Sequence, residues 1–201
     1  IPVIPLLGNV ADKTRVLDIC QTFKVNTIYH AAAYKHVPLV EMNPIEGIKN
    51  NIFGTLHCVE AAIESYVDTF VLISTDKAVR PTNIMGATKR LAEILVLNMN
   101  EVSATNFDIV RFGNVIGSNG SVALIFQKQI QKGGPLTLTD PKMERYFMTI
   151  SEAAGLTLQV SSIGNGGVIF VLDMGDPILI KTLAENMIKQ RSEEHTSELQ
   201  S

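Results

Sequence analysis

The strongest constraint on the fold is the alternation of short apolar runs with longer segments of helical periodicity. The run Phe70-Val71-Leu72-Ile73 is apolar at every position, which suits a strand that is buried on both faces of a sheet. Alternating strands and helices predict βαβ units, and therefore a parallel sheet with helices on both faces. We expect strands at residues 3–7, 27–30, 70–74, 107–112 and 168–172, and helices at residues 13–23, 44–65, 83–100, 121–132, 151–162 and 177–189.

Capping residues support these helices. Asp12, and either Thr82 or Asn83, suit N-caps, while Pro44 and Pro177 suit the first turn of a helix. In the second predicted helix, Asn51 and Gly54 interrupt the periodic pattern.

Composition excludes several classes of protein. A chain of 201 residues can bury a hydrophobic core, and a net charge of −3 argues against a nucleic-acid binder that neutralises phosphates. No apolar run approaches the roughly 18 to 20 residues of a membrane-spanning helix. The two cysteines fall in predicted helices without metal-ligand spacing and the four histidines are scattered, so we expect buried thiols and no metal site.

The start of the chain suggests a piece of a longer protein, and its end suggests a segment foreign to the domain. The chain starts at Ile1-Pro2 without an initiator methionine or a leader. Residues 191–201 read RSEEHTSELQS, which resembles the translation of a sequencing adapter; the alternative is a natural acidic tail. We leave this segment out of the predicted domain.

Polar segments follow three of the predicted strands, where ligands bind in open α/β sheets. They span residues 30–38, 74–82 and 111–121, and the last is rich in glycine. Each segment alone is typical of an ordinary polar turn. If all three open on one edge of one sheet, however, a hydroxyl, a carboxyl and two amino groups meet there.

Three segments also carry a family resemblance: STDKAVRPTNIMGATKRLAE at residues 74–93, AAAYKHVP at 31–38 and RFGNVIGSNGSV at 111–122. They resemble the CapD-like polysaccharide-biosynthesis branch of the extended short-chain dehydrogenase/reductase superfamily, which includes UDP-N-acetylglucosamine 4,6-dehydratases. The resemblance covers residues 1–190. It implies a Rossmann-like doubly wound parallel sheet that lacks its first strands, with part of a small substrate-binding lobe. Without the glycine-rich first turn, we expect residues 1–190 to be a partial NAD(P)-binding dehydratase/epimerase domain that is poorly stable and binds dinucleotide weakly.

The resemblance implies catalytic roles around the second of these polar segments. Lys77 matches the base that removes the proton from C-5 of the hexose, and Asp76 the acid that protonates the departing C-6 hydroxyl. Thr75 occupies the Ser/Thr position of the superfamily, and Lys89 matches the lysine that holds the nicotinamide ribose. Met85 stands where the superfamily ordinarily has tyrosine, so the acceptor of the C-4 hydroxyl proton stays unassigned.

The resemblance also implies binding residues for NADP or NAD and for a UDP-activated amino sugar. The cofactor residues are Asn9, Val10, Ala31, Ala32, Ala33, Asn51, Lys89, Phe112, Gly113 and Val115. The family usually has aspartate at the position of Asn9. The substrate residues are Lys35, His36, Asn114, Ser121 and Arg145. An arginine can fork onto diphosphate oxygens, but Arg145 is equally well explained as a surface charge beside Glu144.

The sequence leaves three hypotheses about function. The first is a 4,6-dehydratase for bacterial surface glycans, and the second is a UDP-sugar 4-epimerase. The third, a non-catalytic cofactor-sensing module, is supported by Met85 alone. Residues 171–175, VLDMG, resemble the large membrane-anchored members, which implies a cytoplasmic catalytic domain in a parent that can be anchored in the bacterial inner membrane. The family also implies a homo-oligomer.

Overall fold

The structure is a computed structural model, and it describes residues 2–118, 120–138 and 140–198. The chain divides into two compact units, which we describe separately. Residues 1–112 and 155–172 belong to the first unit, and residues 113–154 and 173–201 to the second.

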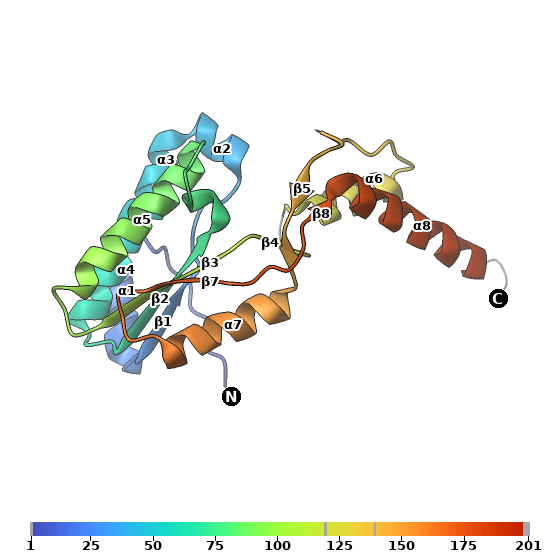
Figure 1. The fold of residues 1–201 in the computed structure, drawn as a ribbon. Coiled ribbons are helices and arrows are strands. Elements are labelled where there is room, and N and C mark those ends of the chain that lie inside the picture. The colour runs from blue at the N-terminus through green and yellow to red at the C-terminus, as the bar shows by residue number, and fades with distance from the viewer. Residues whose placement is uncertain (1, 119, 139, 199–201) are drawn as a thin grey trace. The chain divides into compact units, whose positions relative to one another are not determined.

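A parallel sheet organises the first unit. Its strands are β1 (Thr27–His30), β2 (Thr69–Thr75), β3 (Asn106–Phe112) and β7 (Ile169–Val171), in the order β1-β2-β3-β7 (Figure 1). His30 pairs with Leu72, and Thr75 pairs with Phe112. Four of the predicted strands are therefore confirmed, and the carboxyl ends of β1, β2 and β3 share one edge of the sheet.

The strand expected at residues 3–7 is wrong. This segment has no regular structure, and Val3 and Leu7 are 87% and 94% exposed. A strand requires a neighbour for its backbone N–H and C=O groups, and residues 3–7 pair with none of the described strands. Apolar composition alone does not make a strand when the pairing partner is missing.

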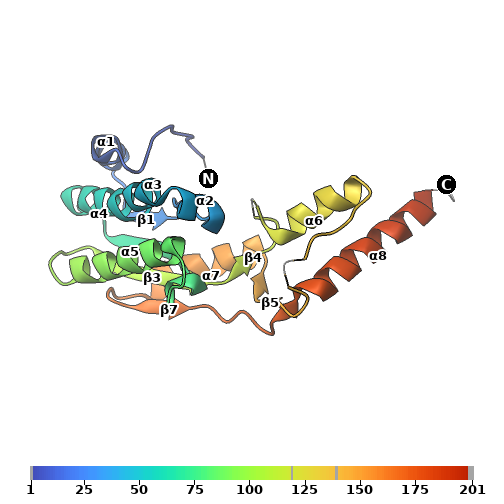
Figure 2. The ribbon, with the colours of Figure 1, turned by 90° about the horizontal axis from the view of Figure 1, so that it is seen from above.

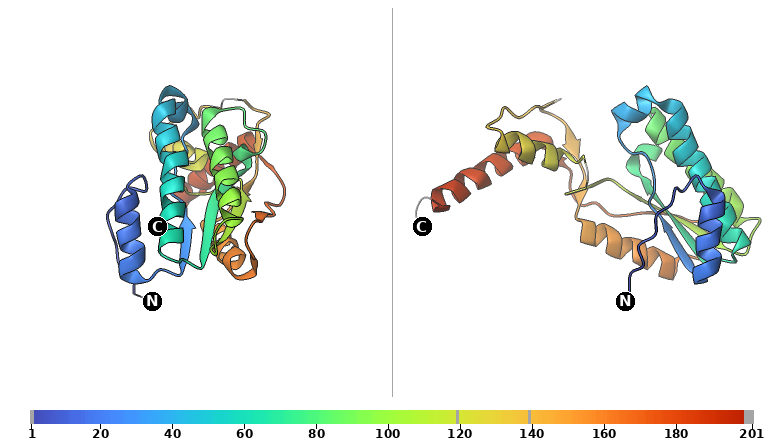
Figure 3. Two further views of the ribbon diagram at one scale, coloured as in Figure 1. Left: turned by 90° about the vertical axis from the view of Figure 1, so that its left-hand side faces the viewer. Right: turned by 180° about the vertical axis from the view of Figure 1, so that it is seen from behind.

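Helices cover both faces of the sheet. On one face lie α4 (Gly54–Glu64) and α5 (Ile84–Asn100), and α1 (Lys13–Phe23) packs beside α4 (Figure 2). The core between this layer and the sheet consists of Cys58, Val59, Ala62, Val67, Phe70, Leu72, Ala92, Val96, Phe107 and Ile109. On the opposite face is the second half of α7 (Ile150–Ile163) (Figure 3). There Ser161 forms a hydrogen bond with Tyr29 of β1.

The helix predicted at residues 44–65 forms in three parts. These are α3 (Pro44–Ile48), a π-helical turn η1 (Lys49–Phe53) and α4. The π-helical turn lies around Asn51, where the periodicity is interrupted, and such turns are frequent at functional sites. A further short helix, α2 (Val37–Met42), was not predicted.

The helix caps are partly as expected. The side chain of Asp12 accepts a hydrogen bond from the Arg15 N–H, and Asn83, rather than Thr82, caps α5 by accepting from the Gly86 N–H at 2.8 Å. Pro44 lies in the first turn of α3. The expectation for Pro177 is wrong, because Ile178 and Leu179 form a strand before the last helix begins.

In its described residues, the second unit contains two small sheets, two further helices and the first part of α7. In the first sheet, β4 (Asn114–Val115) pairs in parallel with β6 (Phe147–Met148); in the second, β5 (Glu144–Arg145) pairs antiparallel with β8 (Ile178–Leu179). The helices α6 (Val122–Gln131) and α8 (Ile180–Glu198) pack around Phe126, Ile180 and Ala184. Within residues 2–118, 120–138 and 140–198, no helix has the length and apolarity needed to cross a membrane.

The cap of α5 yields a test of the fold. Asn83→Ala removes the acceptor of the Gly86 N–H, and losing such a cap costs about 1 kcal/mol. Asn98→Ala, on the same helix, removes only an exposed bond to the Ile94 carbonyl, so we expect a loss below about 0.5 kcal/mol. Urea unfolding of both variants measures the difference, and equal losses would contradict the capping role of Asn83.

Candidate active site at the carboxyl edge of the sheet

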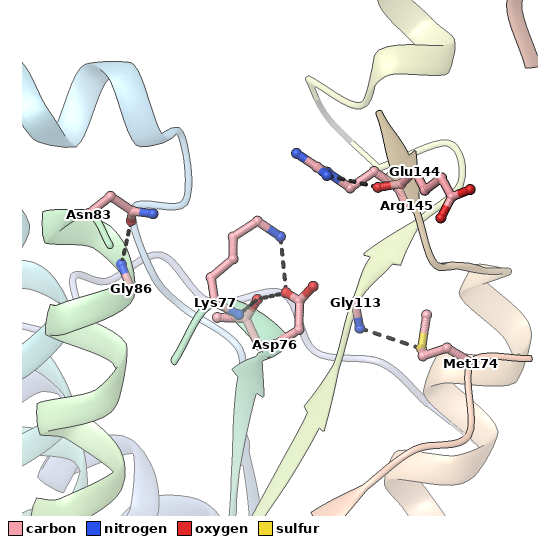
Figure 4. A network of polar contacts seen from close by, with 9 residues as sticks. Asp76, Lys77, Asn83, Gly86, Gly113, Glu144, Arg145 and Met174 are labelled. Carbon is pink, nitrogen blue, oxygen red and sulfur yellow. Dashed lines mark hydrogen bonds and ion pairs between the residues drawn. The ribbon is translucent and has the colours of Figure 1, made fainter. Parts of the chain in front are cut away.

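Thr75, Asp76 and Lys77 form a compact polar group where β2 ends. Asp76 and Lys77 belong to a single turn of 3-10 helix, η2 (Asp76–Ala78). Lys77 Nζ lies 3.0 Å from Asp76 Oδ1 (Figure 4). The Thr75 hydroxyl donates to the same oxygen at 2.8 Å. The structure therefore brings an amine, a carboxyl and a hydroxyl together, all partly accessible to solvent.

The start of α5 holds this turn in place. A Cβ atom on Gly86 would overlap the Lys77 carbonyl oxygen and come within 3.2 Å of Pro81 Cβ. Only a glycine therefore lets η2 approach the helix so closely. Met85 is 3% exposed and lies next to Gly86 in the hydrophobic core, and its thioether cannot exchange a proton.

Lys89 lies one turn further along α5 and is almost fully buried. It is 5% exposed, and its Nζ donates to the Ile73 carbonyl of β2 at 2.7 Å. Burial lowers the pKa of Lys89 to about 8, and the negative charge of Glu93 opposes this shift. Lys89 therefore reaches the end of β2 with a buried amine whose pKa lies below the ordinary lysine value.

Glu93, which was not among the predicted site residues, is fully buried beside Lys89. Its carboxylate accepts hydrogen bonds from Ser74 at 2.6 Å, Arg111 at 2.8 and 2.5 Å, and Arg90 at 3.0 Å. Burial alone would raise the pKa of Glu93, but these bonds outweigh it and hold the pKa below its ordinary value. The sequence signal was available, since Glu93 lies four residues after Lys89 on the same helix face.

Asn51 joins the loop after β1 to α5. Its side chain is 1% exposed, accepts from the Tyr34 N–H at 2.7 Å, and donates to the Tyr34 carbonyl and to the Thr88 hydroxyl, both at 3.0 Å. The polar atoms of Asn51 are thus used within the protein. The predicted cofactor residue acts in this structure by fixing the loop that contains Ala31, Ala32 and Ala33.

His30, the last residue of β1, continues this buried network. The Thr55 hydroxyl donates to the Asn51 carbonyl at 2.8 Å, so its single proton is used there. His30 Nε2, 3.0 Å from the same hydroxyl, must therefore be the donor. Burial, and then the charge of Lys89, lower the pKa of His30 to about 4, which keeps the ring neutral.

The remaining predicted residues of the first unit are spread more widely. Ala31, Ala32, Lys35 and His36 are exposed, and Phe112 is the last residue of β3. Asn9 forms a turn before α1 by accepting from the Ala11 N–H at 2.9 Å. Val10 packs against the main core.

The other predicted residues belong to the second unit. The N–H of Gly113 donates to the Met174 sulfur at 3.4 Å (Figure 4). Asn114 and Val115 form β4. Ser121 is the N-cap residue of α6, and its hydroxyl has no hydrogen-bond partner among the described residues. Arg145 is exposed and donates to the carbonyl of Glu144 at 2.8 Å.

The burial of Lys89 predicts a pH-dependent stability. The folded-state pKa of about 8 lies below the ordinary lysine pKa of 10.5, so the unfolded chain binds the proton more tightly between these values and stability rises with pH in that window. Lys89→Met removes the buried amine, and with it the free-energy cost of burying its positive charge. Its stability advantage over the wild type should shrink by about 2 kcal/mol from pH 7 to pH 10.

Urea unfolding at several pH values measures this change. Lys128→Met, on the exposed surface of α6, controls for the general effect of removing a lysine. A constant difference between Lys89→Met and the wild type would contradict the buried-amine interpretation.

The sequence is similar to several curated proteins. It is 54% identical over 187 residues to the capsular polysaccharide biosynthesis protein CapD of Staphylococcus aureus, covering 92% of this chain and 31% of CapD. It is 38% identical over 169 residues to a UDP-N-acetylglucosamine 4,6-dehydratase (inverting) of Campylobacter jejuni, covering 82% of this chain and 50% of that enzyme. It is 42% identical over 150 residues to a UDP-glucose 4-epimerase of Rickettsia rickettsii, covering 73% of this chain and 44% of that epimerase. The chain therefore spans between about a third and a half of these relatives.

Solved structures support the fold. Pen from Bacillus thuringiensis superposes with a TM-score of 0.88 at 39% identity, covering 92% of this chain and 58% of Pen. The dTDP-glucose 4,6-dehydratase DesIV of Streptomyces venezuelae, solved with NAD bound, superposes with a TM-score of 0.86 at 18% identity over 92% of this chain and 62% of DesIV. The parallel sheet with helices on both faces is thus the expected Rossmann-like fold.

A family match covers nearly the whole chain. The description of that family is polysaccharide biosynthesis protein, and the match extends over residues 1–200. This agrees with the similarity to CapD and with the fold of the first unit. The chain belongs to the polysaccharide biosynthesis protein family.

Proposed function

We propose that the full-length protein containing this chain is a nucleotide-sugar 4,6-dehydratase. It uses NADP or NAD and converts a UDP-N-acetylglucosamine-like substrate into a 4-keto-6-deoxy sugar. The observation that carries this proposal is the contact between Asp76 and Lys77 at the carboxyl end of β2. The similarity to the Campylobacter dehydratase supports it.

The residues at this edge suit a dinucleotide. Ala31 and Ala32 leave the backbone after β1 exposed, and Lys89 brings a buried amine to the end of β2. Ala33, Phe112, Gly113 and Val115 are the further contacts we propose, with Asn9 and Val10 toward the adenine. Once bound, the nicotinamide would accept a hydride from C-4 of the sugar and return it to C-6, so the net reaction is the loss of water.

Asp76 and Lys77 perform the elimination in this proposal. Lys77 takes the proton from C-5, the bond between C-6 and its hydroxyl breaks, and Asp76 supplies the proton that completes the departing water. For this step Lys77 must be neutral and Asp76 protonated. The two groups lie 3.0 Å apart, so the proposed base and acid are side by side.

The oxidation at C-4 needs a different set of side chains. Thr75 orients the C-4 hydroxyl, and either Asp76 or a water takes its proton, since Met85 cannot. Lys89 holds the nicotinamide ribose and adds positive charge that favours the loss of this proton. Lys35, His36, Asn114, Ser121 and Arg145 are the proposed contacts to the nucleotide sugar.

A 4-epimerase is the second candidate, because the chain is also 42% identical to a UDP-glucose 4-epimerase. An epimerase also oxidises C-4 but returns the hydride there, and it has no use for an acid and a base at C-5 and C-6. Incubating the full-length protein with UDP-N-acetylglucosamine separates the candidates. A 4-keto-6-deoxy product supports the dehydratase, UDP-N-acetylgalactosamine the epimerase, and retained cofactor without turnover the sensing module.

The paired side chains predict the outcome of mutagenesis. Lys77→Ala and Asp76→Asn should each lower kcat for dehydration by about 10²- to 10⁴-fold, the usual contribution of a general acid or base. A matched control is Lys49→Ala, because Lys49 forms a similar ion pair with Glu46 at 2.9 Å within helical turns before α4. If Lys77→Ala retains dehydratase activity, the catalytic roles are contradicted and Asp76 and Lys77 belong to an ordinary polar turn.

A further inference from the structure

We propose that Glu93 is a positioning residue that fixes the ends of β2 and β3 against α5, and thereby places Thr75, Asp76 and Lys77 for reaction. The structural part of this inference stands on the contacts of Glu93. Its effect on turnover rests on the proposed function.

The carboxylate of Glu93 joins three elements. Oε1 accepts from the Ser74 hydroxyl at 2.6 Å and from Arg111 Nε at 2.8 Å, and Oε2 accepts from a terminal nitrogen of Arg111 at 2.5 Å. Ser74 and Arg111 are paired residues of β2 and β3. One side chain of α5 therefore holds a matched pair of residues in the sheet.

The residues held by Glu93 directly precede the candidate site. Ser74 is followed by Thr75, Asp76 and Lys77, and Arg111 is followed by Phe112. One turn earlier on α5, Lys89 bonds to the carbonyl of Ile73, the residue before Ser74. Two successive turns of α5 thus contact two successive residues of β2, which restricts both sliding and rotation of the strand end against the helix.

Stability alone does not explain this arrangement. Apolar side chains of similar volume often stabilise a core as well as a buried ion pair does. An apolar residue at position 93, however, would offer no directed contact to Ser74 or Arg111. Arg90 also contacts Glu93, but it lies on α5 itself and its side chain is 41% exposed, so it joins no second element.

This difference between the partners of Glu93 defines the experiment. In the full-length protein, Glu93→Gln retains the side-chain length but loses the charge that both nitrogens of Arg111 contact. Arg90→Ala removes an ion pair of Glu93 without affecting the contacts between elements. Val96→Ala, at a fully buried position of α5, reports the effect of a general loss of stability.

Two measurements are made well below the melting temperature of every variant. Hydrogen exchange of the amides of residues 73–75 and 110–112 reports local order, and initial rates with UDP-N-acetylglucosamine separate kcat from KM. In Glu93→Gln we expect the exchange rates of these amides to increase over the wild type by a factor at least ten times larger than for amides in the rest of the sheet. We also expect kcat to fall at least tenfold, while KM changes less than threefold. In Arg90→Ala and Val96→Ala, we expect no selective increase in the exchange of these amides and no tenfold fall in kcat.

The outcomes separate this inference from the proposed function. If Glu93→Gln behaves like Val96→Ala in both measurements, the positioning role is overturned. If local exchange rises but kcat does not change, the effect on turnover is overturned. If the wild type converts no UDP sugar, the proposed function fails, and the local exchange alone then decides whether Glu93 positions the strand ends.

Discussion

The parallel pairing of β2 between β1 and β3 is the constraint on which the first unit depends. It aligns the carboxyl ends of the three strands, so segments far apart in sequence leave the sheet at one edge. Burial of Phe70 and Leu72 against α4 and α5 secures one face of β2. Because β2 is surrounded by packed elements, the polar residues that follow it start from a rigid base.

Buried hydrogen bonds fix the positions of helices and loops that apolar packing alone leaves variable. Hydrophobic contacts are not directional and leave a helix free to shift slightly along a strand. The contacts of Asn51 and Lys89 are directional, and each links a helical segment to the backbone of a loop or strand. Both side chains are buried, and therefore little screened by water. Hydrophobic burial thus accounts for the layers, and buried hydrogen bonds for the placement of the site within them.

Local patterns predicted most of this architecture. The strands near Thr27, Phe70, Phe107 and Ile169 were expected because short runs rich in apolar, aromatic and β-branched residues favour a strand. Residues 3–7 have a similar run but no partner, since pairing is not a local property. The short strands of the second unit, such as Glu144–Arg145, were missed because two residues carry no periodicity. The grouping of Thr75, Asp76 and Lys77 followed from adjacency, whereas the contacts of Glu93 with Ser74 and Arg111 depend on strand register.

The approach of η2 to α5 at Gly86 has a consequence for the tolerance of the site to mutation. A single methyl group there would collide with the Lys77 carbonyl oxygen, whereas the core residues between the sheet and the layer of α4 and α5 lie elsewhere. The clash would displace η2, and with it the Asp76 carboxyl and the Lys77 amine, relative to α5. The geometry of the candidate site therefore depends on this one position, which is not part of the main core.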